Sequence, residues 1–174
     1  MKINVPCGRH VLDGWTNVDI IASDHPKCKG KPQILADMAS IPLPDNCADE
    51  LLSVHGIEHV LPWVADQVLV EWKRLLKPGA LLAIECPDLF KCCENIVSGY
   101  TVPGKHPDQF GMWGIFGDDR LGDEFMMHRF GYTPKTMRAK LQRAGFVDIQ
   151  DEQPQWHQSG KSRRDLRITA RKPA

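Results

Sequence analysis

The first two apolar segments of the chain lie too close together for the helix that normally joins parallel strands. Ile3–Cys7 and Trp15–Asp19 each have the composition of a short strand, and only Gly8–Gly14 lies between them. A crossover helix needs about a dozen residues. Two arrangements are open. Asp13-Gly14 between apolar flanks is typical of a hairpin, which would make the strands antiparallel. However, about seven extended residues span roughly 23 Å, which suffices for a parallel return.

The turn after the first strand and the acid at the end of the second indicate a ligand site. In an open α/β sheet, ligands bind at the carboxyl ends of the strands. Gly8 would let the backbone approach a ligand closely, and Asp19 could accept hydrogen bonds from both hydroxyls of a ribose. The pair suggests an adenosine-containing cofactor, although a single glycine and a single acid also occur in ordinary turns and strand ends.

Strands alternate with helices through the rest of the chain. Val64, Val68, Leu69, Trp72 and Leu75 recur at helical spacing after Pro62, and Lys77-Pro78-Gly79 would end that helix. Thr133-Pro134 begins another helix, which Gly145 would end. The remaining apolar runs predict strands, and the alternation predicts a three-layer α/β fold. These runs are Ile34–Met38, Ala48–Val54, Ala80–Cys86, Phe146–Ile149 and Leu166–Ala170.

The segment Ser98–Thr133 interrupts this alternation. It is rich in glycine and aromatic residues and has few regular patterns. Long irregular segments in compact domains are commonly functional lids. A chain of 174 residues fits one domain. We therefore expect a single domain, residues 1–174, in which 98–133 form a lid or acceptor-binding insertion.

Charge and cysteine content exclude several classes of protein. Lysine plus arginine equals aspartate plus glutamate, at 22 each, which argues against nucleic-acid binding. The basic residues between Arg163 and Lys172 are expected on a solvated hairpin. Six cysteines form no C-x-x-C pair, and no metal site is expected. No leader segment opens the sequence, and no apolar run approaches about 18 residues, so we expect a cytoplasmic protein without membrane partners.

A series of short motifs runs through the chain in a fixed order. They are Asn4–Gly8, Gly14–Asp19, Ala36–Met38, Ile41–Asp45, Val54–His59, Glu71–Gly79, Pro87–Leu89 and Ala144–Phe146. The most specific is R-x-L-K-P-G at Arg74–Gly79, because it follows Glu58-His59 at a characteristic distance. Together, over about residues 2–92 and 128–150, they resemble class I S-adenosylmethionine-dependent methyltransferases, most closely the small type 11 branch.

The resemblance implies a fold and a cofactor. The fold would be a Rossmann-like three-layer sandwich with a mostly parallel sheet and a terminal antiparallel strand. The first crossover helix would be shortened or absent, which favours the parallel return over the hairpin. The cofactor would be S-adenosyl-L-methionine, with Asp19 on the ribose, Ile20 and Met38 against the adenine, and Asp37 on its amino group. The remaining positions implied for the cofactor are Pro6, Cys7, Gly8, Ser53, Val54 and His55.

The implied reaction is methyl transfer to an oxygen or nitrogen atom. Near-neutral charge and an aromatic lid favour a small-molecule or sugar acceptor. Pro6 stands where the family usually has glycine and removes a backbone N–H. This motivates an alternative, a non-catalytic module that binds S-adenosylmethionine or a nucleotide. A nicotinamide dehydrogenase is a second alternative, but the chain lacks G-x-G-x-x-G.

Three residues are candidates for acid–base chemistry. His128 is favoured as a base over His106, because it adjoins the start of a helix and is better fixed. His55 follows a buried strand, and Asp88 lies just past another strand end. Glu58 and His59 are expected at the start of a helix, where the helix dipole favours an acid. His59 is expected to make a structural contact.

Overall fold

The first two strands are parallel. The computed structural model of the chain describes residues 1–22, 30–101, 107–118, 124–156 and 163–174. Within it, β1 (Lys2–Asn4) pairs with β2 (Thr16–Asp19) in parallel, with Ile3 opposite Thr16. The hairpin interpretation of Asp13-Gly14 is therefore wrong, because the connecting loop returns along the strand before β2 begins.

Two buried asparagines hold this loop in the place of a helix. Asn4 donates from Nδ2 to the Oδ1 of Asn17 and to the carbonyl of His10, both at 2.8 Å. The same Oδ1 accepts from the N–H of Leu12 at 2.8 Å, and Asn17 Nδ2 donates to the carbonyls of Leu12 and Trp15 at 3.0 Å. These side-chain bonds satisfy backbone groups that a helix would have paired internally.

A seven-stranded sheet forms the centre of the molecule, in the order β3-β2-β1-β4-β5-β7-β6. β7 runs antiparallel to both of its neighbours, and the other pairs are parallel. The mostly parallel Rossmann-like sheet with an antiparallel terminal strand is thus confirmed. The remaining strands are β3 (Ile34–Leu35), β4 (Ala48–Val54), β5 (Leu76–Pro87), β6 (Val147–Glu152) and β7 (Asp165–Arg171).

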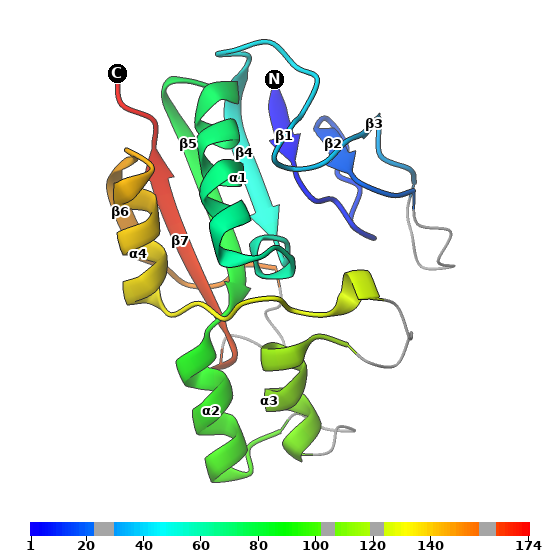
Figure 1. Ribbon diagram of the computed structural model, residues 1–174, viewed down its shortest axis with the longest axis vertical. Coiled ribbons are helices and arrows are strands. Elements are labelled where there is room, and N and C mark those ends of the chain that lie inside the picture. The colour runs from blue at the N-terminus through cyan, green and yellow to red at the C-terminus, as the bar shows by residue number, and fades with distance from the viewer. Residues whose placement is uncertain (23–29, 102–106, 119–123, 157–162) are drawn as a thin grey trace.

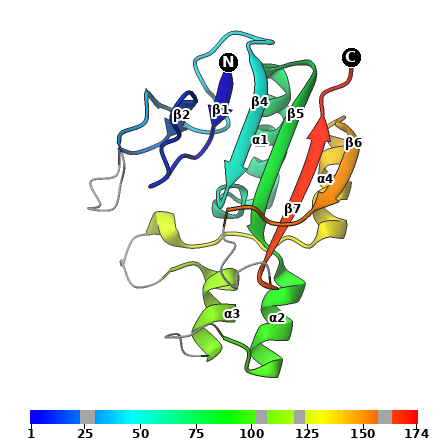
Figure 2. The same ribbon diagram turned by 180° about the vertical axis from the view of Figure 1, so that it is seen from behind.

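Two helices cover one face of this sheet (Figure 1). α1 (Pro62–Leu75) buries Val68, Leu69 and Trp72, and α4 (Pro134–Arg143) buries Met137 and Leu141, all within one apolar core. Figure 2 shows that no helix of the described segments lies across the opposite face. The described segments thus provide a helical layer on one face only, rather than the expected layers on both faces, because the described parts of the β1–β2 and β2–β3 connections contain no helix.

A polar network occupies the face without helices. Glu85 alternates with the core residues Ile84 and Cys86, so its side chain points to that face. Its carboxylate accepts from the backbone N–H groups of Gln155 and Trp156 at 2.9 and 3.0 Å and contacts Arg167 at 3.4 Å. Arg164 and Arg167 are buried in acidic pairs, so the prediction of a solvated basic hairpin is wrong for these two residues.

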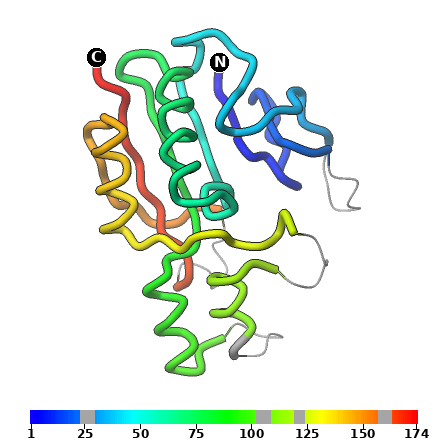
Figure 3. The backbone as a smooth tube through the Cα atoms, in the orientation of Figure 1, coloured from blue at the N-terminus to red at the C-terminus, as the bar shows by residue number. Residues whose placement is uncertain are grey.

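The remaining helices lie beyond the carboxyl ends of the strands (Figure 3). α2 (Leu89–Ser98) packs on α3 (Pro107–Phe116). Of two single turns, η1 (Ile57–His59) follows β4 and η3 (Glu124–Met126) follows α3 in the chain. α3 falls inside the segment expected to be irregular, which corrects that expectation. Within the described ranges, every helix is too short or too polar to span a membrane.

Candidate functional site

A pocket opens where β1 and β4 end. It is lined by Asn4, Pro6, Cys7, His10, Val54 and Trp156. Pro6, Cys7 and Val54 are among the residues that the sequence assigns to a cofactor. Asn4, His10 and Trp156 are not, because the resemblance gives these three positions no role at the cofactor. Trp156 reaches the pocket because its backbone N–H is fixed on Glu85.

The glycine turn and the acid at the end of β2 are joined directly. Gly8 has a left-handed backbone, with φ of 50°, which favours glycine. Its N–H donates to Asp19 Oδ2 at 2.7 Å. The other oxygen of Asp19 accepts only a long bond of 3.3 Å from the N–H of Ile21 among the described residues. The buried carboxylate therefore fixes the turn with one oxygen and keeps acceptor capacity on the other.

The other residues assigned to the cofactor differ in exposure. Asp37 is exposed and accepts from the N–H of Ala39 at 2.8 Å, one strand along from Asp19. Ile20 is half exposed, and Met38 packs partly against the core. Ser53 is fully buried, and its Oγ has no hydrogen-bond partner among the described residues. Thus Asp19, Ile20, Asp37 and Met38 share the edge formed by β2 and β3.

Pro6 is wedged against Gly56. The Val5–Pro6 peptide is cis, and a Cβ added at Gly56 would lie 2.1 Å from Cδ of Pro6 and 3.0 Å from Oγ of Ser53. Gly56 thus allows the wall of the pocket to approach the segment that carries Glu58 and His59.

We expect Gly56→Ala to lower the free energy of unfolding by about 1–3 kcal/mol, as overpacking does in other cores. Urea unfolding would measure the change. In a double-mutant cycle with Pro6→Ala, part of the loss should be recovered, because the clash requires the proline ring. Strictly additive losses would show that the contact with Pro6 is not the cause.

His55 follows β4 with a left-handed backbone, with φ of 51°, which is uncommon for a residue with a side chain. Its N–H donates to the carbonyl of Glu85 at 2.8 Å. The imidazole bridges two carboxylates, with Nδ1 3.0 Å from Glu58 Oε1 and Nε2 3.3 Å from Asp165 Oδ2. Burial disfavours the charged ring, but the hydrogen bonds to Asp165 and Glu58 outweigh it and raise the pKa of His55 to about 9.

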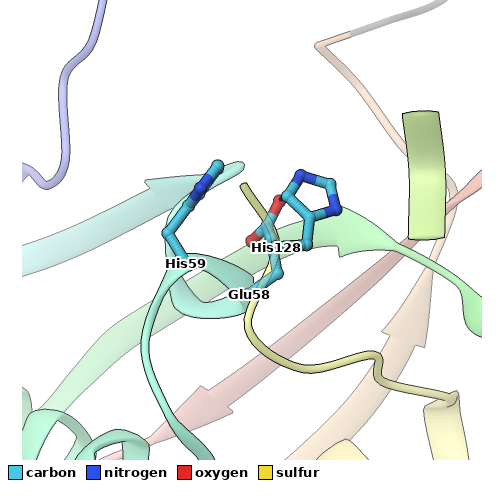
Figure 4. Close-up of side chains that lie close together, drawn as sticks. All are labelled: Glu58, His59 and His128. Atoms are coloured by element: carbon cyan, nitrogen blue, oxygen red, sulfur yellow. Dashed lines mark ion pairs between the residues drawn. The ribbon is translucent and has the colours of Figure 1, made fainter. Parts of the chain in front are cut away.

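His128 and His59 converge on the same glutamate (Figure 4). Nε2 of His128 lies 4.0 Å from Glu58 Oε1, and the rings of His59 and His128 meet edge to face with centroids 4.8 Å apart. The N–H groups of Arg129 and Phe130 donate to the carbonyl of Glu58, which joins the two segments. Burial lowers the pKa of His128 to about 4, so its imidazole is neutral near pH 7.

Asp88 has a structural contact of its own. It is the N-cap of α2, where its carboxylate accepts from the N–H of Phe90 at 3.0 Å, and burial raises its pKa. His55 and His128 are therefore brought together through Glu58, whereas Asp88 is engaged at a helix end. His106 lies outside the described residues. Glu58 and His59, expected to be structural, stand at the centre of the cluster.

Comparison with known proteins gives a family match over part of the chain. A family model described as a methyltransferase domain, of the type 11 kind, matches residues 10–84. No curated protein matches the sequence.

Solved structures resemble the whole chain. A SAM-dependent methyltransferase from Archaeoglobus fulgidus shares 17% identity over 98% of this chain and 85% of its own, with a TM-score of 0.62. 1,6-Didemethyltoxoflavin-N1-methyltransferase from Burkholderia thailandensis was solved with 1,6-didemethyltoxoflavin and S-adenosylhomocysteine. It shares 16% identity over 99% of this chain and 71% of its own, with a TM-score of 0.62. Human N-acetylserotonin methyltransferase, in complex with SAM, shares 17% identity over 99% of this chain and 47% of its own, with a TM-score of 0.59. At these identities the likeness establishes the fold.

Proposed function

We propose that the chain is a class I S-adenosylmethionine-dependent methyltransferase of the type 11 kind and that it methylates an oxygen or nitrogen atom of a small-molecule or sugar acceptor. The observation that carries the proposal is the bond between Gly8 and Asp19 at the ends of β1 and β2. It places a close-approach turn and a carboxylate with spare acceptor capacity at the edge where such sheets bind ligands.

Each residue of this edge has a proposed role. Asp19 holds the ribose hydroxyls, with Ile20 against the adenine. Asp37 accepts from the adenine amino group, and Met38 packs on the ring. The methionine end would contact Pro6, Cys7, Gly8, Ser53, Val54 and His55. The pocket at Pro6, Cys7 and Val54 supports the last assignment, whereas the burial of Ser53 limits it to a supporting contact.

The proposed reaction is an in-line displacement. The acceptor atom forms a bond to the methyl carbon while the carbon–sulfur bond breaks, and the electron pair stays on sulfur to give S-adenosylhomocysteine. Positioning supplies much of the acceleration in such a step. Of the three candidate bases, His128 is neutral near pH 7, while His55 is protonated and Asp88 caps a helix. We assign His128 the proton of a hydroxyl acceptor.

Residues 98–133 are proposed as the acceptor-binding insertion of a single domain, residues 1–174. In the described part of this segment, α3 and η3 carry the exposed side chains of Phe116 and Phe125. Apolar aromatic surface of this kind suits a small organic acceptor. Free, buried thiols at Cys86 and Cys92 support a reducing, cytoplasmic setting.

Binding of S-adenosylhomocysteine tests the cofactor assignment. Asp19→Ala is expected to weaken binding by about tenfold or more in calorimetry, because loss of a charged hydrogen-bond acceptor costs about 1.5–3 kcal/mol. The matched control is Asp13→Ala, which removes an exposed carboxylate from the preceding loop and should leave the affinity unchanged. Equal affinity in a folded Asp19→Ala protein would remove Asp19 from the site.

The two alternatives predict different outcomes of the same titration. A nicotinamide dehydrogenase would bind NAD in preference to S-adenosylhomocysteine. A non-catalytic module would bind S-adenosylmethionine but release no S-adenosylhomocysteine with any acceptor. Product release with a matched hydroxyl or amine acceptor therefore separates the enzyme from the binding module.

A further inference from the structure

Glu58, His59 and His128 have the chemistry and the spacing of a metal-binding set. One potential ligand atom from each side chain lies within 4.8 Å of the other two. Figure 4 shows the glutamate between the two imidazoles, with His59 from η1 and His128 from the segment that follows η3. Backbone hydrogen bonds from Arg129 and Phe130 to the Glu58 carbonyl hold these two segments together, so the approach does not depend on the side chains alone.

Both histidines are held in the tautomer that a metal ligand needs. His59 Nδ1 lies 3.2 Å from the carbonyl of Met127, and His128 Nδ1 lies 3.0 Å from the carbonyl of Gly114. A carbonyl can only accept, so each Nδ1 carries the proton and each Nε2 presents a lone pair. A backbone carbonyl on the second ring nitrogen is the usual outer contact of a metal-bound histidine, because it fixes the orientation of the ring.

The glutamate provides a second, independent observation. Its side chain is only 2% exposed. Oε1 contacts Nδ1 of His55 at 3.0 Å, whereas Oε2 has no hydrogen-bond partner among the described residues. A buried carboxylate oxygen without a partner is costly. A cation between Glu58 and the two imidazoles would supply that partner, while His55, itself held by Asp165, would orient the carboxylate through Oε1.

We propose that Glu58, His59 and His128 bind one divalent first-row transition-metal ion. Two imidazole nitrogens and one carboxylate oxygen suit zinc, cobalt, iron or manganese better than magnesium, which prefers oxygen ligands. Three protein ligands leave open positions, as in catalytic metal sites. Zinc–nitrogen distances are about 2.0–2.1 Å, so the side chains must converge slightly from their present separation.

The consequence for catalysis rests on the proposed function. An ion at this position would bind the acceptor hydroxyl, lower its pKa and release its proton to solvent before the oxygen attacks the sulfonium methyl. With the ion bound, Nε2 of His128 would be a metal ligand and could not accept a proton. The ion, rather than His128, would then promote deprotonation of the acceptor hydroxyl.

Cobalt(II) titration of the metal-depleted full chain, without cofactor or acceptor, tests the site. Visible absorption distinguishes imidazole–carboxylate coordination from binding to the cysteines. We expect one ion per chain, and about tenfold or greater loss of affinity in each of Glu58→Gln, His59→Ala and His128→Ala. His10→Ala removes an exposed imidazole outside the cluster and should bind cobalt normally.

Thermal unfolding guards against misfolded variants. Bound ion should raise the melting temperature of the wild-type protein but not of His59→Ala, whose side chain is only partly buried. Absence of stoichiometric binding, or binding that all three variants retain, would overturn the site. These experiments measure metal binding and not methyl transfer. Failure of the metal site would therefore leave the methyltransferase proposal intact, because that proposal is tested by binding of S-adenosylhomocysteine.

Discussion

Asp165→Asn is expected to lower the free energy of unfolding by about 3–5 kcal/mol, the loss typical of a broken buried ion pair. Asp165 is 0% exposed. It accepts from Arg164 Nε at 2.7 Å and Nη2 at 3.3 Å, and it contacts His55 Nε2 at 3.3 Å. Asparagine keeps the shape but removes the charge and turns an acceptor into a donor. Arg164 would then remain buried without its counter-charge.

Urea unfolding, followed by circular dichroism, would measure this loss. The matched control is Asp151→Asn, which breaks an exposed pair with Arg138 at 2.8 Å. Asp151 is 52% exposed, and pairs of this kind contribute at most about 1 kcal/mol. If the two variants lost similar stability, burial would not be what makes the Asp165 pair important.

His128→Asn is expected to reduce turnover by about 100-fold or more while leaving affinity for S-adenosylhomocysteine nearly unchanged. The asparagine amide can take the position of Nδ1 and keep the hydrogen bond to the carbonyl of Gly114. Only Nε2 is lost, and both proposed roles of His128, base and metal ligand, require that atom. Release of S-adenosylhomocysteine would be followed with the first acceptor that the wild-type protein methylates.

Cobalt binding in the same variant separates the two roles. A wild-type protein that binds cobalt and a variant that does not would assign His128 to the metal site. A wild-type protein that binds none would leave His128 as a base. Unchanged turnover in His128→Asn would exclude both roles, and positioning alone would then account for the reaction.

The elements predicted best from sequence are those in which several local signals agree. Ala48–Val54 is the observed β4, and the helix that begins at Pro62 ends at Leu75, just before the predicted stop at Lys77-Pro78-Gly79. Thr133 caps α4 as expected, with a hydrogen bond from the N–H of Thr136. For the helices, apolar periodicity, a proline in the first turn and, in α4, a polar cap all indicate the same boundaries. Tertiary contacts therefore do not shift these boundaries far from the ones that the local sequence favours.

α3 was missed because its sequence lacks an apolar stripe. Pro107–Phe116 is apolar on most sides, and Gly111 and Gly114 resemble helix breakers. In the structure these glycines let α3 approach α2, since a Cβ at Gly111 would lie 2.8 Å from the Cys92 carbonyl and one at Gly114 would lie 2.3 Å from Cys92 Sγ. Close packing on a neighbouring helix, which local propensity cannot report, determines this element.

Candidate site residues could be predicted from the sequence only where they directly follow or end a strand. Asp19 was assigned to the ribose because it ends a strand, and that role stays a prediction. The cluster of Glu58, His59 and His128 was not, because its residues come from distant segments with no recognised ligand spacing. The prediction of a solvated tail was wrong for a related reason. Arg167 faces Glu85, which only the antiparallel addition of β7 brings to it. Arg164 pairs with its sequence neighbour Asp165, and tertiary packing buries both side chains.

The short connection between β1 and β2 also changes how the sheet is assembled. Asn4 lies opposite Asn17 on one side and opposite Leu52 on the other. Parallel pairing usually requires a long segment to close, and the entropy lost grows with the logarithm of its length. Pairing of β1 with β2 closes a loop several-fold shorter than pairing of β1 with β4 does. The entropic cost of closing the shorter loop is about 1 kcal/mol lower. In terms of folding, this parallel pair is a local contact of the kind that hairpins make.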